Sequence, residues 1–243
     1  MVKDTGYILY EGPGNYDGRP IVVIATTESA NPKTGNMWQT WIMRQDIAPN
    51  QAVKSGDDYS VCGNCPLRPL LWRDNGLEKP CYVRTFQAPL SVWKKYKRNG
   101  YPYPKIDFIT QTGLSEIRRL LQGKGIRLGS YGDPSTVPFN VWESIGVGSN
   151  EFTHTAYTHG YLVPGFDERN LTIAMVSLDP ITESMPVGLT GRSFRVINDT
   201  SQLRKGEILC PASKEQDYKT TCAKCGLCAG LGRSAKNIAI VTH

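Results

Sequence analysis

Seven cysteines in two groups are the feature that most constrains the fold of this chain of 243 residues. The first group is Cys62, Cys65 and Cys81, and the second is Cys210, Cys222, Cys225 and Cys228. An odd number of cysteines argues against a full set of disulfides. The opening residues, "MVKDTGYILYEGPG", contain no apolar core of a secretory signal, so we expect a cytoplasmic protein whose thiols stay reduced. Metal binding is then the first use to consider for the cysteines.

The second group has a spacing that favours an iron–sulfur cluster. Cys222, Cys225 and Cys228 follow one another at intervals of two residues, and Cys210 is followed by Pro211. Ferredoxin-type clusters use a similar run, with the fourth cysteine closer than it is here. A zinc site usually takes two separated C-x2-C pairs, and this group supplies only one unless a cysteine is left idle. A 4Fe-4S cube takes all four thiolates, and zinc is the alternative.

The first group lacks a fourth ligand, because no histidine lies between its three cysteines. If the site holds zinc, the fourth ligand is Asp74, Glu78, a distant residue or water. If it holds a 4Fe-4S cluster, one iron stays open to a ligand that is not cysteine, and such an iron can bind a small molecule. A purely structural zinc loop is the alternative interpretation.

The order of apolar and polar segments predicts an α/β fold. From residue 105 onward, helix-like and strand-like segments alternate, which is typical of parallel βα units. Predicted helices cover 112–125, the second half of 133–146 and 179–191, and predicted strands cover 6–13, 19–27, 39–46, 126–132, 152–161, 171–178, 193–198 and 236–243. A partial or complete β/α barrel with parallel strands is the expected architecture. It forms one domain, 1–243, with a cysteine-rich loop at 60–82 and a C-terminal metal-binding segment at 208–230.

Polar residues follow several predicted strands at the same end. They are Asp133, Thr158, His159, Ser177, Asp179, Asn198 and His243. Loops at the carboxyl ends of parallel strands form the active sites of such folds, so Asp133, His159 and Asp179 are candidate catalytic residues. The alternative is structural: the two aspartates precede prolines and suit helix N-caps, His159 is a capping or core residue, and His243 is a frayed terminus.

A net charge of +6 favours anionic partners. The sharpest basic cluster is "VWKKYKRNGYPY", in which cationic and aromatic side chains alternate in a manner that suits a nucleic-acid strand or a nucleotide. Its candidate binding residues are Lys94, Lys95, Lys97 and Arg98. The alternative is a helix whose last turn carries cations and which stops at Gly100. No apolar run is long enough to cross a bilayer, so we expect no membrane partner.

Several of these motifs together resemble a known group of proteins. "CGNCPLR … PCYV", "RLGSYGDP", "YTH", "VSLD" and "CPAS … CAKCGLC … IAIVTH" span nearly the whole chain. This constellation resembles a group of bacteriophage and prophage proteins, which in turn look like distant relatives of the radical S-adenosylmethionine enzymes. The resemblance implies a host-cell cytoplasmic location, a partial β/α barrel, a three-cysteine 4Fe-4S cluster near the strand ends and an auxiliary four-cysteine cluster.

Residue by residue, the resemblance makes the first cysteine group the ligands of the open cluster and the second group those of the auxiliary cluster. It also places Gly132, Asp133 and Ser177 near the bound S-adenosylmethionine. One departure is clear, because that superfamily spaces its three cysteines by three and two residues. Here two residues separate Cys62 from Cys65, and Cys81 follows fifteen residues later.

Two functional hypotheses follow. In the first, a phage-type iron–sulfur enzyme cleaves S-adenosylmethionine and forms a radical that attacks a nucleotide or nucleic acid. In the second, both cysteine groups hold structural zinc, and the protein binds nucleic acid in phage replication or gene control. A variant of the second is a nuclease that uses Asp133, His159 and Asp179 with a divalent metal ion.

Overall fold

The computed structural model describes residues 5–29, 31–77, 80–104, 114–179 and 184–242, and its strands form two five-stranded sheets. The first sheet has the order β1 (Gly6–Pro13), β2 (Pro20–Thr26), β3 (Met37–Arg44), β4 (Gly125–Tyr131) and β5 (Thr153–Thr155). The second has the order β6 (Tyr157–Thr158), β7 (Met175–Leu178), β8 (Ser193–Ile197), β10 (Asn237–Val241) and β9 (Glu207–Leu209). The expected α/β class is confirmed.

Strand direction differs between the two sheets. In the first, β1 pairs with β2 and β2 with β3 in antiparallel fashion, whereas β3, β4 and β5 are parallel. The second is parallel throughout. The expectation of parallel strands is therefore wrong for β1 and β2, because the short turn between them can join only antiparallel neighbours.

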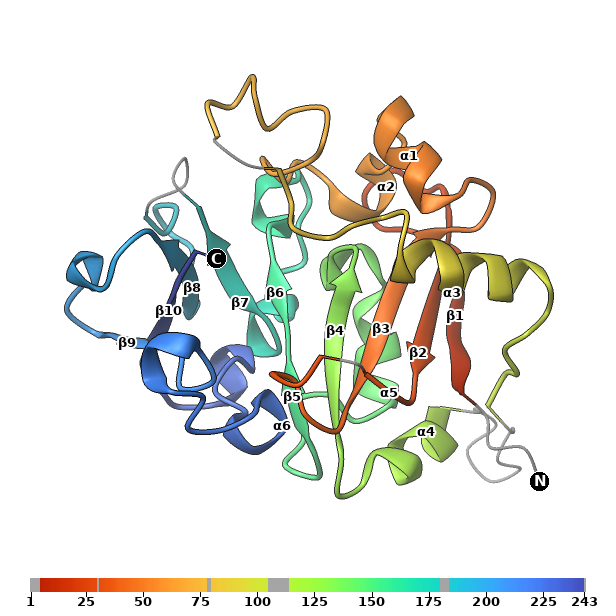
Figure 1. The fold of residues 1–243 in the computed structure, drawn as a ribbon. Coiled ribbons are helices and arrows are strands. Elements are labelled where there is room, and N and C mark those ends of the chain that lie inside the picture. The colour runs from red at the N-terminus through yellow and green to blue at the C-terminus, as the bar shows by residue number, and fades with distance from the viewer. Residues whose placement is uncertain (1–4, 30, 78–79, 105–113, 180–183, 243) are drawn as a thin grey trace.

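The described strands form an open arrangement (Figure 1). β1 and β9 lie at the two outer edges, and no pairing between them is seen over the described residues. A closed barrel is therefore not observed in this part of the chain, and the partial barrel remains a prediction. The parallel strands β3 to β8 and β10 still bring their carboxyl ends to one side of the molecule.

The two sheets meet within one short segment. The sequence predicts a single strand over 152–161, but the structure divides it into β5 and β6 at Ala156. The Ala156 N–H donates to the carbonyl oxygen of Cys228 at 3.0 Å, and its own carbonyl accepts from the N–H of Met175 at 2.9 Å. The cysteine-rich segment is therefore hydrogen-bonded to the junction of the two sheets.

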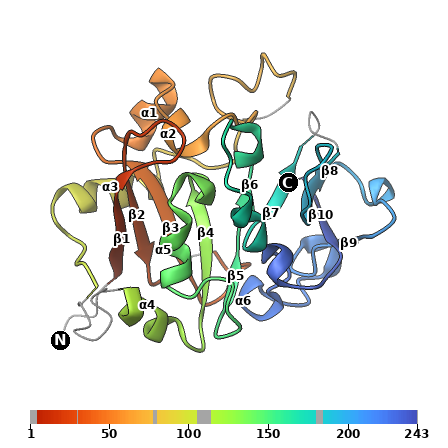
Figure 2. The same cartoon turned by 180° about the vertical axis from the view of Figure 1, so that it is seen from behind.

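Helices cover both faces of the first sheet. The α-helices are α1 (Pro49–Ser55), α2 (Tyr59–Cys62), α3 (Ala88–Lys97), α4 (Leu114–Leu121), α5 (Phe139–Ser144) and α6 (Cys222–Cys225). α3 crosses the face seen in Figure 1, and α5 lies on the opposite face, seen in Figure 2. The core between them contains Trp38, Ile42, Ile117 and Trp142, each at most 2% exposed. Burial of so many large apolar side chains is the main stabilising contribution to this half of the fold.

Short 3-10 helices connect the remaining strands. They are η1 (Pro134–Thr136), η2 (Gly160–Leu162), η3 (Glu168–Thr172), η4 (Thr200–Gln202), η5 (Lys214–Gln216) and η6 (Gly230–Gly232). The strand predicted over 171–178 begins later than expected: its first two residues belong to η3, and β7 begins at Met175.

The helices predicted over 179–191 and 112–125 are only partly covered by the described residues. Residues 184–191 are not helical, because Pro186 and Gly188, with φ of +85°, interrupt the segment. The remainder of that predicted helix, 180–183, lies outside the described residues, as do 112–113 and His243. No described helix has the length and apolar character needed to cross a membrane.

Candidate metal centres

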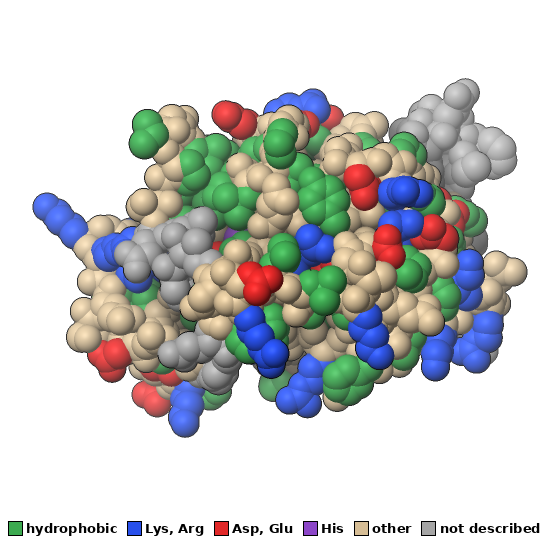
Figure 3. Space-filling model, turned by 90° about the horizontal axis from the view of Figure 1, so that it is seen from above, with side chains coloured by type: hydrophobic (Ala, Val, Ile, Leu, Met, Phe, Trp, Pro, Cys, Tyr) green, Lys and Arg blue, Asp and Glu red, His purple; other side chains and the backbone are tan. Residues whose placement is uncertain are grey.

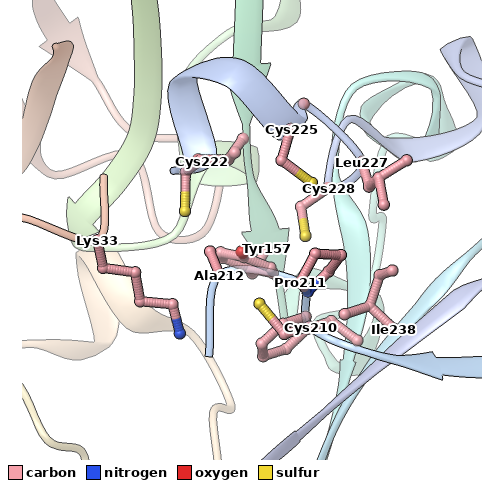
Figure 4. A pocket seen from close by; sticks show the side chains of 13 residues that line it. Lys33, Tyr157, Cys210, Pro211, Ala212, Cys222, Cys225, Leu227, Cys228 and Ile238 are labelled. Atoms are coloured by element: carbon pink, nitrogen blue, oxygen red, sulfur yellow. The ribbon is translucent and has the colours of Figure 1, made fainter. Parts of the chain in front are cut away.

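The second cysteine group converges on one cavity of about 30 Å³. Cys210 follows β9, Cys222 and Cys225 lie on α6, and Cys228 comes three residues later. Figure 4 shows the four sulfur atoms around a common space, with Cys210 across the cavity from the other three. Cys210 and Cys228 are buried, and the other two are half-buried. The structure thus brings together the four cysteines that the sequence assigns to one site.

Local backbone geometry positions these cysteines. Gly226 ends α6 in the left-handed region, with φ of +60°, and its N–H donates to the carbonyl of Cys222 at 3.0 Å. The first residue of α6 is bonded to the polar loop before β3, because the Cys222 N–H donates to the carbonyl of Lys33 at 2.9 Å. No motif in the sequence indicates this contact between the loop and α6.

Burial favours the neutral thiol at three of these cysteines, Cys210, Cys222 and Cys228. It raises the pKa of Cys228 to about 12 against a hydrogen bond from Tyr157, and it also raises the pKa of Cys210 and of Cys222. The positive charge of Lys33 partly offsets the rise at Cys210 and Cys222. Metal ligation requires thiolates, so metal uptake at this cavity must release protons.

The spacing of the ligands bears on the kind of metal group. Over the described residues, no set of three or more histidine, cysteine or acidic side chains lies close enough to hold a single metal ion. A zinc ion needs four sulfurs at about 2.3 Å from one point. A 4Fe-4S cube spreads its thiolates over four corners. The choice between a 4Fe-4S cube and zinc at this cavity therefore remains a prediction.

The first cysteine group lies in the loop after α2. The N–H of Cys65 donates to the carbonyl of Cys62 at 3.2 Å, and the N–H of Cys81 donates to the carbonyl of Leu67 at 2.8 Å, which returns the loop to its start. Burial raises the pKa of Cys62 well above its ordinary value, with further contributions from Asp58, Cys65 and Cys81. The three thiols are thus within electrostatic range of one another.

A buried ion pair holds this loop. The Arg68 guanidinium lies 2.5 Å from the carboxylate of Asp58, and both side chains are at most 8% exposed. Arg68 also donates to the carbonyls of Gly56 at 2.7 Å and Gly63 at 3.3 Å. One side chain therefore links the residues on both sides of α2, which ends at Cys62.

Asp133 connects α2 with the carboxyl ends of β4 and β6. Its N–H donates to the carbonyl of Val61 at 2.6 Å. Its Oδ1 accepts from the Ser135 N–H and hydroxyl and from the Thr158 hydroxyl, and its Oδ2 accepts from the His159 N–H at 2.7 Å. The N-cap interpretation of Asp133 is confirmed at η1. Because both oxygens are engaged, this carboxylate positions its neighbours.

His159 and Asp179 meet beside Cys65. The Nε2 atom of His159 is 3.3 Å from Oδ2 of Asp179, and both residues are buried. Burial alone lowers the pKa of His159, but the charge of Cys65 and hydrogen bonds with Asp179 and Cys65 outweigh it and raise the pKa to about 10. The sequence places these residues at strand ends but gives no sign that they contact a cysteine. The effect of Cys65 on the pKa of His159 indicates that this pair lies near the first cysteine group.

Besides Asp133, the residues expected near S-adenosylmethionine are Gly132 and Ser177, and both have structural contacts. Gly132 has a φ of +80°, and a Cβ there would lie 2.6 Å from the carbonyl oxygen of Ile42, so close packing against β3 explains the glycine. Ser177 lies on β7, and its carbonyl accepts from the Tyr161 hydroxyl at 2.8 Å. A cofactor-binding role for either residue remains a prediction.

The basic segment forms the end of α3, as the structural interpretation expects. The Lys95 ammonium lies 4.6 Å from the centre of the Tyr101 ring, and that of Lys97 lies 5.6 Å from the Trp93 ring. Lys94, Lys97 and Arg98 are exposed. Seen from above, basic side chains are spread along the margin of the molecule among apolar and acidic ones (Figure 3). Some of the aromatic rings proposed for base stacking are therefore already covered by lysines of the same chain.

Comparison with protein-family models, with curated proteins and with solved structures gave no match.

Proposed function

We propose that the protein is an iron–sulfur protein whose four-cysteine cavity holds a 4Fe-4S cluster. The observation that supports this most is the convergence of Cys210, Cys222, Cys225 and Cys228 on one cavity. Such a cluster supplies one-electron transfer when bound.

The residues around the cavity suit a group with net negative charge. Lys33 lines the cavity, and Arg127 is near enough to lower the pKa of Cys222. Arg192 fixes the loop that carries Cys228, because its Nη1 atom donates to the carbonyls of Leu227 at 2.7 Å and Gly230 at 3.1 Å. These cations stabilise thiolates in a buried place where desolvation disfavours them.

The proposal extends to the first cysteine group. Cys62, Cys65 and Cys81 would hold a second cluster at the carboxyl ends of the strands, as in the partial barrel expected from the sequence. There the protein would act as a radical S-adenosylmethionine-like enzyme on a nucleotide or nucleic acid in the cytoplasm. In support, Cys65 and Cys81 are near enough to raise the pKa of Cys62, and Cys65 is near enough to raise the pKa of His159, which contacts both Asp133 and Asp179.

Metal analysis of protein purified without oxygen tests the proposal. We expect a brown protein with about eight iron atoms per chain, or about four if only one cluster assembles. Cys228→Ser should remove the iron of the four-cysteine cavity, and Cys62→Ser should remove that of the other site. Ser213→Ala, a buried change close to Cys210, is the control and should keep all the iron. Colourless protein with about two zinc ions would refute the proposal.

That result would instead support a zinc-stabilised nucleic-acid-binding protein. The observation in favour of this second candidate is the exposure of Lys94, Lys97 and Arg98 on α3. If these residues contact phosphates, replacing all three with glutamine should weaken binding to DNA or RNA and reduce its salt dependence. A metal-dependent nuclease is less well supported, because both oxygens of Asp133 already accept hydrogen bonds.

A further inference from the structure

A second and larger cavity lies beside the cysteine segment. It is an open groove of about 660 Å³, formed by the turn before β4, the loop that leads into β5 and the segment from α6 to Ser234. Both views of the ribbon show α6 beside β5 at the lower edge of the molecule (Figures 1 and 2). Small-molecule sites commonly have volumes of about 300–1,000 Å³, so this groove can hold a small molecule.

The groove lies at the amino ends of its two strands. Lys124 directly precedes β4 and Phe152 directly precedes β5, and both residues line it, so we call it the amino-end groove. Asp133 and His159 follow the carboxyl ends of β4 and β6. The amino-end groove is therefore separate from the site near the first cysteine group.

The amino-end groove carries an excess of positive charge. Among the described residues that line it, Glu151 is the only acid, and both of its oxygens accept from the Arg118 guanidinium, with Nε 2.8 Å from Oε2. Lys124 and Arg233 are the cations of the lining, and neither has an ion-pair partner over the stretches that the structure describes. An anion in the groove would meet two positive charges that no carboxylate neutralises.

The two cations reach the groove from different sides. The Lys124 ammonium lies 5.6 Å from the centre of the Trp38 ring on β3. The Arg233 guanidinium lies over Gly226 at the end of α6, where a Cβ would come within 2.9 Å of its Nη1 atom. In the order of the first sheet, β4 and β5 lie between β3 and the side that α6 contacts. This separation suits a ligand with more than one anionic group.

We propose that the amino-end groove binds a small molecule that carries two or more phosphate groups. Lys124 and Arg233 pair with the phosphates, and Ser149, Asn150 and Ser234 line the groove as neutral hydrogen-bond donors. Each phosphate has three strongly accepting oxygens, so it can bind an arginine and a neighbouring donor together more completely than a carboxylate can. The inference requires no metal, so it can fail while the proposed function stands, and the reverse also holds.

Titration calorimetry of protein purified without oxygen tests the proposal. The probes are tripolyphosphate and ATP, and adenosine and citrate serve as comparisons without phosphate. The buffer contains about 0.15 M salt, which screens long-range attraction between exposed charges, and no divalent cations. We expect both phosphate probes to bind with a Kd between about 1 μM and 1 mM, the usual range for enzyme ligands, and to bind more tightly than either comparison. Absence of phosphate binding at about 1 mM, or tighter binding of citrate, would overturn the proposal.

Single substitutions locate the bound phosphates. Arg233→Gln and Lys124→Gln should each weaken tripolyphosphate binding about 10- to 100-fold, the loss expected for a charged hydrogen bond. Asn150→Asp adds a negative charge to the groove without removing a cation, and it should also weaken binding. Arg233 and Asn150 are exposed, so their variants should unfold at the same temperature as the parent protein without ligand.

Lys236→Gln is the matched control. Lys236 is exposed, lies three residues after Arg233 and does not line the groove, so its loss removes the same charge and should leave the affinity unchanged. Equal weakening by Lys236→Gln and Arg233→Gln would show attraction to net charge alone. Unchanged affinity in both Arg233→Gln and Lys124→Gln would place the ligand elsewhere on the chain. Either result would overturn the proposal.

Discussion

Replacement of Asp133 by asparagine should destabilise the protein strongly, although the two side chains have the same shape. Asparagine keeps one oxygen for the three donors that bond to Oδ1 and puts an amide N–H where Oδ2 accepts from the His159 N–H. A buried backbone N–H without an acceptor costs about 1–3 kcal/mol, and the remaining hydrogen bonds lose their charge-assisted strength. We expect a loss of about 2–4 kcal/mol in the free energy of unfolding.

Urea unfolding of metal-matched samples measures this loss. The control is Asp199→Asn, at a cap whose Oδ1 accepts from the Ser201 N–H at 2.8 Å but whose side chain is exposed. Asparagine caps helices nearly as well as aspartate, so this change should cost less than about 1 kcal/mol. Equal losses in the two variants would refute the argument that Asp133 joins α2 to the strand ends.

Three further changes test other parts of the structure. Gly132→Ala should lower the free energy of unfolding by more than the roughly 1–2 kcal/mol of left-handed strain, because its Cβ also meets the backbone of β3. Gly18→Ala is the control: its Cβ meets no atom within 4 Å, so urea unfolding should show the loss from strain alone. Burial lowers the pKa of His154 from 6.5 to about 4, so the unfolded chain takes up a proton first and stability falls as the pH drops through this window, by up to about 3 kcal/mol. His154→Gln should lack that part of the pH dependence, and an unchanged slope would contradict it. Asp58→Asn, which breaks the buried pair with Arg68, should cost about 3–5 kcal/mol in thermal or urea unfolding. The corresponding change in the exposed Asp167–Arg169 pair should cost below about 1 kcal/mol, and similar losses for the two pairs would count against the burial argument.

Sequence reasoning succeeds here where local pattern decides structure. The unbroken apolar run in β2 and the turn before it specify a buried strand, and the structure has it at Pro20–Thr26. The end of α3 at Lys97, before Gly100, also agrees with a local signal. The four cysteines of the second group lie close enough in sequence for their shared cavity to be anticipated.

Local pattern fails where distant segments decide the outcome. No periodicity shows that Ala156 interrupts a strand, because its carbonyl and N–H are bonded to Met175 and to the Cys228 segment. For the same reason the sequence does not show that His159 and Asp179 pair with each other. The two side chains meet only after β6 and β7 have aligned their carboxyl ends. The predicted strand ends indicate which polar residues lie on the same side of the sheet. Which side chains each of them contacts follows only from the three-dimensional fold.

The position of Ala156 has a consequence for measurement. Its amide proton is bonded to Cys228, one of the candidate ligands, and lies at the junction between the sheets. Exchange of this proton with deuterated solvent requires that bond to open. A single backbone amide can thus report whether loading of the cysteine cavity makes the two sheets behave as one cooperative unit.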